Sequence, residues 1–140
     1  MIAIRSPHWL RRGGTLVEFA LVAPVFFVMV LGLIEIGRAY MVSELLTEAA
    51  RRACRQGVIE GTSSSAIQSA ATNFLTSMGI SGESANVYVN DAPAGSSNVS
   101  SMPAYTEITV VVTVPAANVA WAPVWFLTGT LSGQYTMRRE

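Results

Sequence analysis

The residues with the clearest potential for chemistry lie near the N-terminus, where one carboxylate interrupts an apolar run. Glu18 follows Gly14 by four residues, and Gly13 and Gly14 themselves follow Arg12. A carboxylate in a low-dielectric environment needs a positive partner or a route to water. Cleavage between the two glycines would create an α-amino group on Gly14 that could compensate Glu18, partially within one chain and more fully between offset neighbouring chains. The alternative is that Glu18 reaches the cytoplasmic lipid headgroups.

The apolar run that carries this carboxylate is long enough to cross a membrane. Residues 19–34 hold no charge, and extension back to Leu16 gives 19 residues with one charge, whereas about 20 apolar residues span a bilayer. Three arginines precede the run, which predicts a cytoplasmic N-terminus and an exported remainder. Pro24 predicts a helix kink that a membrane helix tolerates. The run exceeds the length of a cleaved secretory signal, and no A-x-A-like site follows it.

Arg12-Gly13 followed by "GTLVEF" (residues 14–19) resembles the processing motif of type IVb prepilins and pseudopilins. The longer string "GGTLVEFALVAPVFFVMVLGLIEIGRAY" resembles the TadE-like proteins of the tight adherence (Tad) system, and the likeness covers roughly residues 11–57. The resemblance implies that a membrane prepilin peptidase cuts between Gly13 and Gly14. It also implies that Glu18 and Phe19 act in assembly, where Glu18 compensates the new amine.

The membrane helix is expected to continue into an amphipathic segment, because apolar and charged residues recur there at spacings of three and four on opposite faces. The apolar stripe holds Ala39, Val42, Leu46, Ala49 and Ala53, and the charged stripe holds Glu44, Glu48, Arg51 and Arg55. A solvated face is favoured for the arginines over binding of an acidic partner or lipid. We expect one helix from about Thr15 to Gln56, with Gly57 as its stop.

The remaining residues predict a small α+β domain. Residues 61–65 form a cap-like loop before a second short helix, whose apolar positions are Ile67, Ala70, Ala71, Phe74 and Met78. Alternation predicts strands at 86–90 and 105–114, and a last strand is expected at about 130–137. Residues 91–103 are rich in turn formers and are expected to be an exposed loop. Trp121, Trp125 and Phe126 either fill one end of the core or form a docking patch.

The predicted fold class is therefore α+β: a long N-terminal helix with a membrane half and an amphipathic half, a short second helix, and an antiparallel sheet of about three strands packed on the helix. The expected segments are a cytoplasmic leader at 1–13 that is removed, a transmembrane helix at 14–34, an amphipathic extension at 35–57 and an exported domain at 58–140.

Composition excludes several classes of function. The formal net charge is zero, so nucleic acid is not an expected partner. Cys54 is the only cysteine and His8 the only histidine, which leaves no metal site, no cofactor and no nucleophilic catalytic set. Cys54 is either a small buried residue or a bridge between chains. A hydrolase using Asp91 and Glu107 has no supporting motif, so we expect no enzyme and no small-molecule substrate.

The predicted function is a minor pilin-like or pseudopilin-like component of Flp pilus (Tad) assembly, or of a related secretion apparatus. The resemblance implies as partners the prepilin peptidase, other pilin-like subunits, the Tad machinery and inner-membrane lipid. The expected location is the inner membrane, with a single pass and an exported C-terminal domain, and an extracellular pilus after assembly. The alternative is an unprocessed, signal-anchored envelope protein whose exported domain binds a partner.

Overall fold

The computed structural model describes residues 10–59, 61–95, 99–120 and 128–139. These residues divide into two compact units, the first ending at Ile36 and the second beginning at Gly37. The cluster Trp121, Trp125 and Phe126 lies outside the described residues, as does His8.

A single long helix, α1 (Leu10–Val58), makes up the described part of the first unit, and its C-terminal part belongs to the second unit. The prediction of a long N-terminal helix is confirmed, and Pro24 lies inside it. The role given to Gly57 is wrong: this glycine is buried within the helix, and a Cβ there would lie 2.9 Å from Cδ1 of Ile67. Gly57 therefore permits close packing, and the glycine with positive φ (85°) is Gly61 in the following turn.

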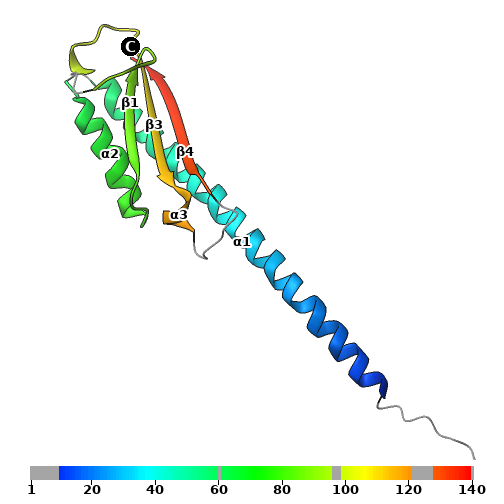
Figure 1. Ribbon diagram of the computed structural model, residues 1–140. Coiled ribbons are helices and arrows are strands. Elements are labelled where there is room, and N and C mark those ends of the chain that lie inside the picture. The colour runs from blue at the N-terminus through cyan, green and yellow to red at the C-terminus, as the bar shows by residue number, and fades with distance from the viewer. Residues whose placement is uncertain (1–9, 60, 96–98, 121–127, 140) are drawn as a thin grey trace, which may run out of the picture. The chain divides into compact units, whose positions relative to one another are not determined.

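The second unit contains a four-stranded antiparallel sheet in the order β2-β1-β3-β4, which Figure 1 shows with β3 between β1 and β4. The strands are β1 (Ser84–Val89), β2 (Ala92–Pro93), β3 (Glu107–Pro115) and β4 (Thr130–Arg138). The three longer strands match the three predicted ones, and the α+β class is confirmed. The fourth strand, β2, has only two residues and was not predicted.

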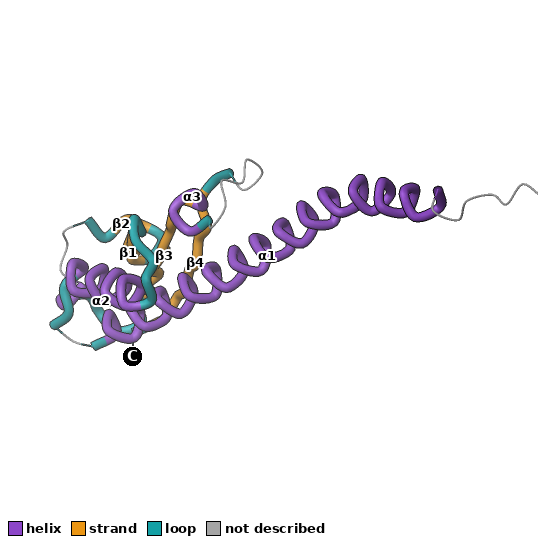
Figure 2. The backbone as a smooth tube through the Cα atoms, turned by 90° about the horizontal axis from the view of Figure 1, so that it is seen from below, coloured by secondary structure: helices purple, strands orange, loops and turns teal. Residues whose placement is uncertain are grey.

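One face of the sheet packs on helices, and the other is polar. The inward positions of β3 are Ile108, Val110, Val112 and Val114, and all four are fully buried. Both α2 (Ser64–Ser77) and the C-terminal part of α1 lie on this side of the sheet (Figure 2). On the outer face, Thr109 of β3 and Thr136 of β4 pair across the strands with their hydroxyls 2.8 Å apart. The predicted division into a packed face and a mostly polar face is confirmed.

Helix α2 begins at a polar cap, as the sequence indicates. The hydroxyl of Ser63 accepts a hydrogen bond from the backbone N–H of Ala66, the usual way to satisfy a free N–H in the first turn. The helix buries Ile67, Ala71 and Leu75. Met78 was expected on this face and instead is the C-cap residue directly after the helix, where its side chain is exposed.

The segment after β1 differs from the exposed loop that was expected. Asn90 and Asp91 both have positive φ (47° and 64°), which is the geometry of the tight two-residue turn that joins β1 to β2. Further along, Ala94 and Val99 are buried, and residues 99–101 form a short 3-10 helix. This segment is rich in turn-forming residues, and it nevertheless places the apolar side chains of Ala94 and Val99 in the core.

Two contacts fix this domain to the C-terminal part of α1. Gly133 of β4 lies so close to the helix that a Cβ would fall 2.4 Å from the backbone nitrogen of Thr47, within the helix backbone. Cys54 is buried, and its Sγ–H lies 3.1 Å from the carbonyl oxygen of Tyr135 on the same strand. A small residue on the strand and a small residue on the helix therefore allow β4 to cross α1 closely.

Candidate functional site

The N-terminal part of α1 carries the residues expected to act in processing and assembly. Gly13 and Gly14 both lie within the helix, and a Cβ added to Gly14 would meet nothing within 4 Å. Glu18 follows Gly14 by one helical turn, so the two positions share a face. Side chains of a helix lean toward its N-terminus, so a side chain at position 18 extends toward the turn that holds residue 14. An amine created at Gly14 would therefore arise on the same face as Glu18.

The first unit exposes a continuous apolar surface. A shallow hollow on one side of the helix is lined by residues at successive spacings of three, one, three and one: Phe19, Val22, Ala23, Phe26 and Phe27. The rings of Phe26 and Phe27 meet edge to face with centroids 6.0 Å apart. Exposed aromatic and aliphatic side chains on every side are unfavourable in water, and they suit a helix surrounded by lipid or by other helices.

Among the described residues, α1 is the one helix that is long and apolar enough to cross a membrane. Pro24 lies within its apolar part, and proline has no N–H to donate to the carbonyl of Ala20. The helix thus has a local gap in its hydrogen bonding close to the aromatic hollow. Whether it bends there remains a prediction.

The C-terminal domain, by contrast, uses the polar residues named as candidates for structure. Glu107 forms an ion pair with Arg138 (2.9 Å), and its backbone N–H donates to the side chain of Asn90. Asp91 occupies the turn between β1 and β2. Within the described ranges, no group of three or more His, Cys, Asp or Glu residues is arranged to hold a metal ion.

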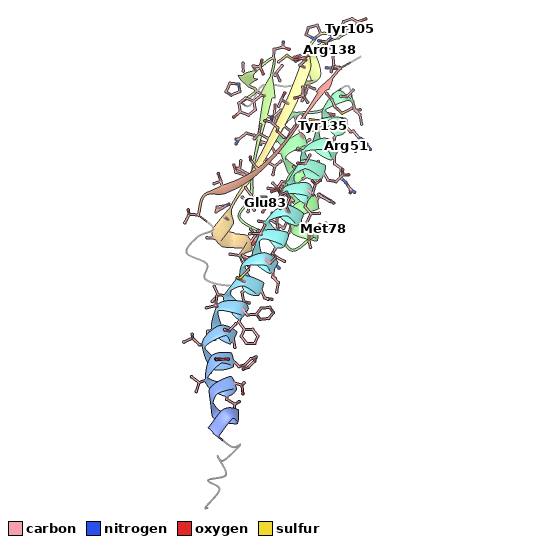
Figure 3. All side chains as sticks on the ribbon, turned by 90° about the vertical axis from the view of Figure 1, so that its right-hand side faces the viewer. Arg51, Met78, Glu83, Tyr105, Tyr135 and Arg138 are labelled. Atoms are coloured by element: carbon pink, nitrogen blue, oxygen red, sulfur yellow. The ribbon has the colours of Figure 1, made fainter. Side chains whose placement is uncertain are left out.

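The arginines of the amphipathic segment lie on its exposed face. Arg52 forms an ion pair with Glu48 (3.0 Å) and lies over the ring of Phe74, 4.2 Å from its centroid. The hydrogen bond from Arg52 lowers the pKa of Glu48. Arg51 lies over Tyr135, as Figure 3 shows, at 5.7 Å. These arginines cover aromatic rings at the edge of the domain, so they are solvated side chains with a packing role.

Three residues with defined roles were missed by the sequence analysis. Arg38 donates a hydrogen bond from Nε to the carbonyl of Val119 on α3 (Ala116–Val119). Arg139 is buried, and its Nη1 donates to the carbonyls of Val99 (3.0 Å) and Met102 (3.1 Å). Gly133 provides the close helix contact. The hydrogen-bond partners of Arg38 and Arg139 lie 37 or more positions away in the sequence, and the contact of Gly133 depends on where its strand lies. No local sequence pattern could therefore reveal these roles.

The fold and the site define a protein with a long apolar N-terminal helix and a small α+β domain built on that helix. Residues 13–55 match the family model described as TadE-like protein. The resemblance to the TadE-like family is confirmed over these residues, which include Glu18 and most of α1. No match was found to a curated protein or to a solved structure. The apolar helix that carries this TadE-like segment is compatible with membrane anchoring.

Proposed function

We propose that this protein is a minor pilin-like or pseudopilin-like component of Tad pilus assembly, or of a related secretion apparatus. In this proposal, a prepilin peptidase cuts between Gly13 and Gly14, and α1 anchors the protein in the inner membrane with its C-terminal domain exported. The observation that carries the proposal is the TadE-like match over residues 13–55, which coincides with the apolar part and most of the amphipathic part of α1.

Compensation of the Glu18 carboxylate by the new amine is a physical reason for the cleavage. A carboxylate near the end of a membrane segment is tolerable when it can reach water or a cation. After cleavage, the amine of Gly14 lies one turn before Glu18 and offers a cation within the chain or to a neighbouring subunit. Because an ion pair is stronger where water is excluded, the pairing between chains would stabilise a bundle of such helices.

The first test is the mass of the protein purified from cells that express the peptidase. We expect a chain that begins at Gly14, and an intact chain from Met1 when the peptidase is inactive. Gly13→Leu should block the cut. Gly37→Leu is the matched control, because it makes the same change on the same helix at a position where a Cβ meets nothing within 4 Å. A full-length chain in peptidase-competent cells would contradict the proposal.

The second test concerns Glu18. We expect Glu18→Gln to be processed normally but to lose crosslinking to other pilin-like subunits in the membrane, because the neutral amide cannot compensate the amine. Glu44→Gln removes an exposed carboxylate further along α1 and should leave the crosslinks unchanged. An unprocessed, signal-anchored envelope protein would instead keep its N-terminus and tolerate Glu18→Leu.

A further inference from the structure

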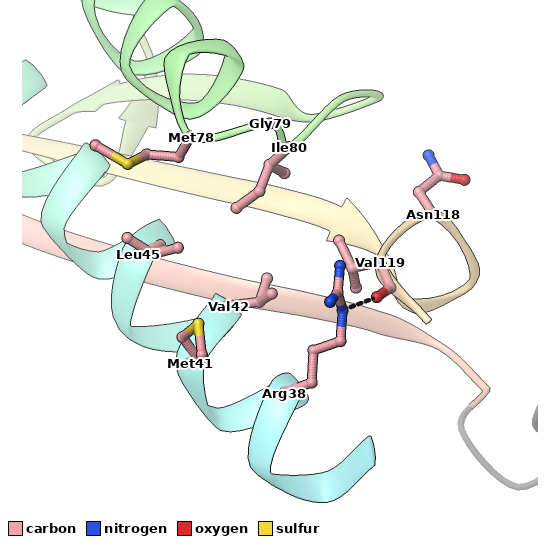
Figure 4. Close-up of a pocket in the computed structure, with 9 residues that line it drawn as sticks. All are labelled: Arg38, Met41, Val42, Leu45, Met78, Gly79, Ile80, Asn118 and Val119. Carbon is pink, nitrogen blue, oxygen red and sulfur yellow. Dashed lines mark hydrogen bonds between the residues drawn. The ribbon is translucent and has the colours of Figure 1, made fainter. Parts of the chain in front are cut away.

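The large exposed apolar side chains of the second unit lie at its two ends. In the described part of this unit they are Tyr40, Met41, Ile59, Met78 and Tyr105. Met41 and Met78 line one pocket, which opens between α1, the residues after α2, and α3 (Figure 4). Figure 3 shows Met78 and Tyr105 at opposite ends of the domain. Ile59 directly follows α1, whose last turn packs against the start of β3 near Tyr105. Apolar surface at both ends suits a domain whose copies meet end to end.

The pocket has the size and the lining for one aromatic ring. Its volume is about 190 Å³, and its walls include Met41, Met78 and Val119 (Figure 4). Pockets for small-molecule ligands usually measure about 300 to 1,000 Å³. An apolar cavity of about 150 Å³, in contrast, is large enough to bind benzene. Methionine side chains adapt to the shape of a partner and pack favourably against aromatic rings. The pocket therefore fits a single aromatic side chain of another molecule better than a free ligand.

Tyr105, at the opposite end of the domain, presents such a ring. Its side chain is 75% exposed, and its φ of 67° lies in the left-handed region that bulky side chains rarely adopt. The backbone N–H of Tyr105 donates to the carbonyl of Arg139 (2.8 Å), which holds the backbone in this conformation. Strained backbone of this kind is found mainly at binding and active sites, where the surrounding structure maintains it. The fold thus keeps an almost free aromatic ring at a fixed place on the surface.

The two ends also carry complementary charges. Arg38 is the one charged residue that lines the pocket, and among the described residues it donates only to the carbonyl of Val119, through Nε. Its two η nitrogens therefore keep their donors. At the other end, Asp91 is exposed and lies in the turn beside Asn90, which exchanges hydrogen bonds with Glu107. No described cation pairs with Asp91, whereas Glu107 already has an arginine partner. Each end thus offers one charge that lacks a partner within the described chain.

We propose that the second units of two copies of this protein associate head to tail. Tyr105 of one copy occupies the pocket of the next, and Asp91 of the first copy lies beside Arg38 of the second. Because the two surfaces differ, the contact does not close a dimer and adds copies in one direction.

This contact is weak by itself. One buried ring contributes about 150 to 250 Å², whereas a stable interface buries about 1,200 to 2,000 Å² in total. It therefore reinforces an assembly in which other contacts already hold the copies close together. The contact involves the second unit alone, so it requires neither the proposed cleavage nor a membrane span. Failure of the proposed function would leave it intact, and the reverse also holds.

Chemical crosslinking of the full-length protein in detergent tests the head-to-tail contact. Ala104→Cys places a thiol next to Tyr105, and Asn118→Cys places one at the pocket (Figure 4). With a short bismaleimide, we expect a mixture of the two variants to form dimers several-fold faster than either variant alone. A chain with both cysteines should form a ladder of longer oligomers. Cys54 is buried, so the parent chain gives the background. Equal rates for the mixture and the single variants would overturn the proposal.

Two substitutions in the cysteine variants identify the ring and the pocket. Tyr105→Asn removes the ring and suits a positive φ, so the fold should persist while the crosslinking of the mixture falls to that of the single variants. Met41→Asp should have the same effect. Tyr40→Asp is the matched control, because Tyr40 is adjacent and similarly exposed (73% against 64%) but does not line the pocket. If Tyr40→Asp abolishes crosslinking and Tyr105→Asn does not, Tyr40 of a second copy fills the pocket and the proposal is wrong.

The charge pair has its own test. Asp91→Asn and Arg38→Gln should each lower the rate of crosslinking, and the two changes together should lower it no further than the stronger one alone. This result is expected because removal of either partner already breaks the pair. Additive effects would mean that the two residues do not meet, which contradicts the proposed orientation of the copies.

Discussion

At the scale of single residues, Gly133 sets how closely the last strand approaches the helix. A Cβ there would fall 2.4 Å from the nitrogen of Thr47 and 2.5 Å from the carbonyl carbon of Leu46, and neither backbone atom can move alone. We expect Gly133→Ala to lower the free energy of unfolding by about 1 to 3 kcal/mol, the usual cost of overpacking. Urea unfolding of the detergent-solubilised protein would measure this.

The matched control is Gly37→Ala, on α1 where a Cβ meets nothing within 4 Å. Because alanine favours a helix over glycine by about 0.5 to 1 kcal/mol, this variant should be neutral or slightly more stable. Equal stability of the two variants would mean that β4 and α1 are further apart than the structure places them.

Cys54 should make stability depend on alkaline pH. Burial raises the pKa of its thiol from 9.0 to about 11, although hydrogen bonds from the backbone of Val110 and Met137 oppose the shift. Between these two values the unfolded chain loses the thiol proton and the folded chain keeps it, so the free energy of unfolding falls as the pH rises from about 9 to about 11. Unfolding titrations across this range would measure the slope.

Cys54→Ala should remove this contribution to the slope. The same protection predicts that thiol reagents modify Cys54 slowly in the folded protein and rapidly in denaturant, because the thiolate is the reactive form. Fast modification of the folded protein would contradict the buried position of this side chain.

At the scale of elements, the segment 99–106 depends on the end of β4. Arg139 donates to the carbonyls of Val99 and Met102, and its backbone N–H donates to Thr106. We expect Arg139→Met to destabilise the domain by about 1 to 3 kcal/mol, because buried carbonyls lose their partner. Hydrogen exchange should show faster exchange of the backbone N–H of Met102, which donates to Val99.

The neighbouring Arg138 provides the comparison. Its ion pair with Glu107 is exposed, and such a pair contributes about 0 to 1 kcal/mol. Arg138→Met should therefore have a small effect on unfolding. If the two variants were equally stable, the contacts of Arg139 with residues 99–102 would have no structural importance.

The same elements show what the sequence could predict. The alternation of apolar and polar residues predicted the ends of β3 and β4 to within two residues. This works because consecutive side chains of a half-buried strand point alternately to the core and to solvent. The turn at Asn90 and Asp91 left a usable signal, since both residue types tolerate positive φ, but β2 is too short for a pattern. The burial of Val99 could not be predicted, because it depends on Arg139, 40 residues away.

For the candidate site, the residues and the helix that carries them could be predicted from the sequence. The structure places Gly14 and Glu18 one turn apart on the same face of that helix. The functional roles of Gly13, Gly14, Glu18, Phe19 and Pro24 stay predictions, because they concern a cut chain among neighbours in a membrane. A pocket lined by Arg38, Met78 and Val119, among others, was not predictable, since its sides come from three elements whose packing no local pattern specifies.

At the scale of the whole molecule, the buried hydrophobic cluster of the described residues lies between Val42 and Val119 and so within the second unit. We expect a fragment of residues 37–140 to fold on its own in water, because it keeps this cluster and loses mainly exposed apolar surface. Near-ultraviolet circular dichroism and a single cooperative urea transition would show it. A fragment of residues 50–140, which lacks Val42, Leu46 and Ala49, should fail to fold. A molten 37–140 fragment would contradict this division.

The outer edge of the sheet that β4 forms affects how the detached domain behaves in solution. β4 ends the strand order, its nine residues include neither proline nor lysine, and no described strand pairs with its free side. Uncovered strand edges of this kind join readily to one another. Preparations of the detached domain should consequently self-associate as they are concentrated, and a lysine in the middle of that edge is the simplest way to keep samples monodisperse.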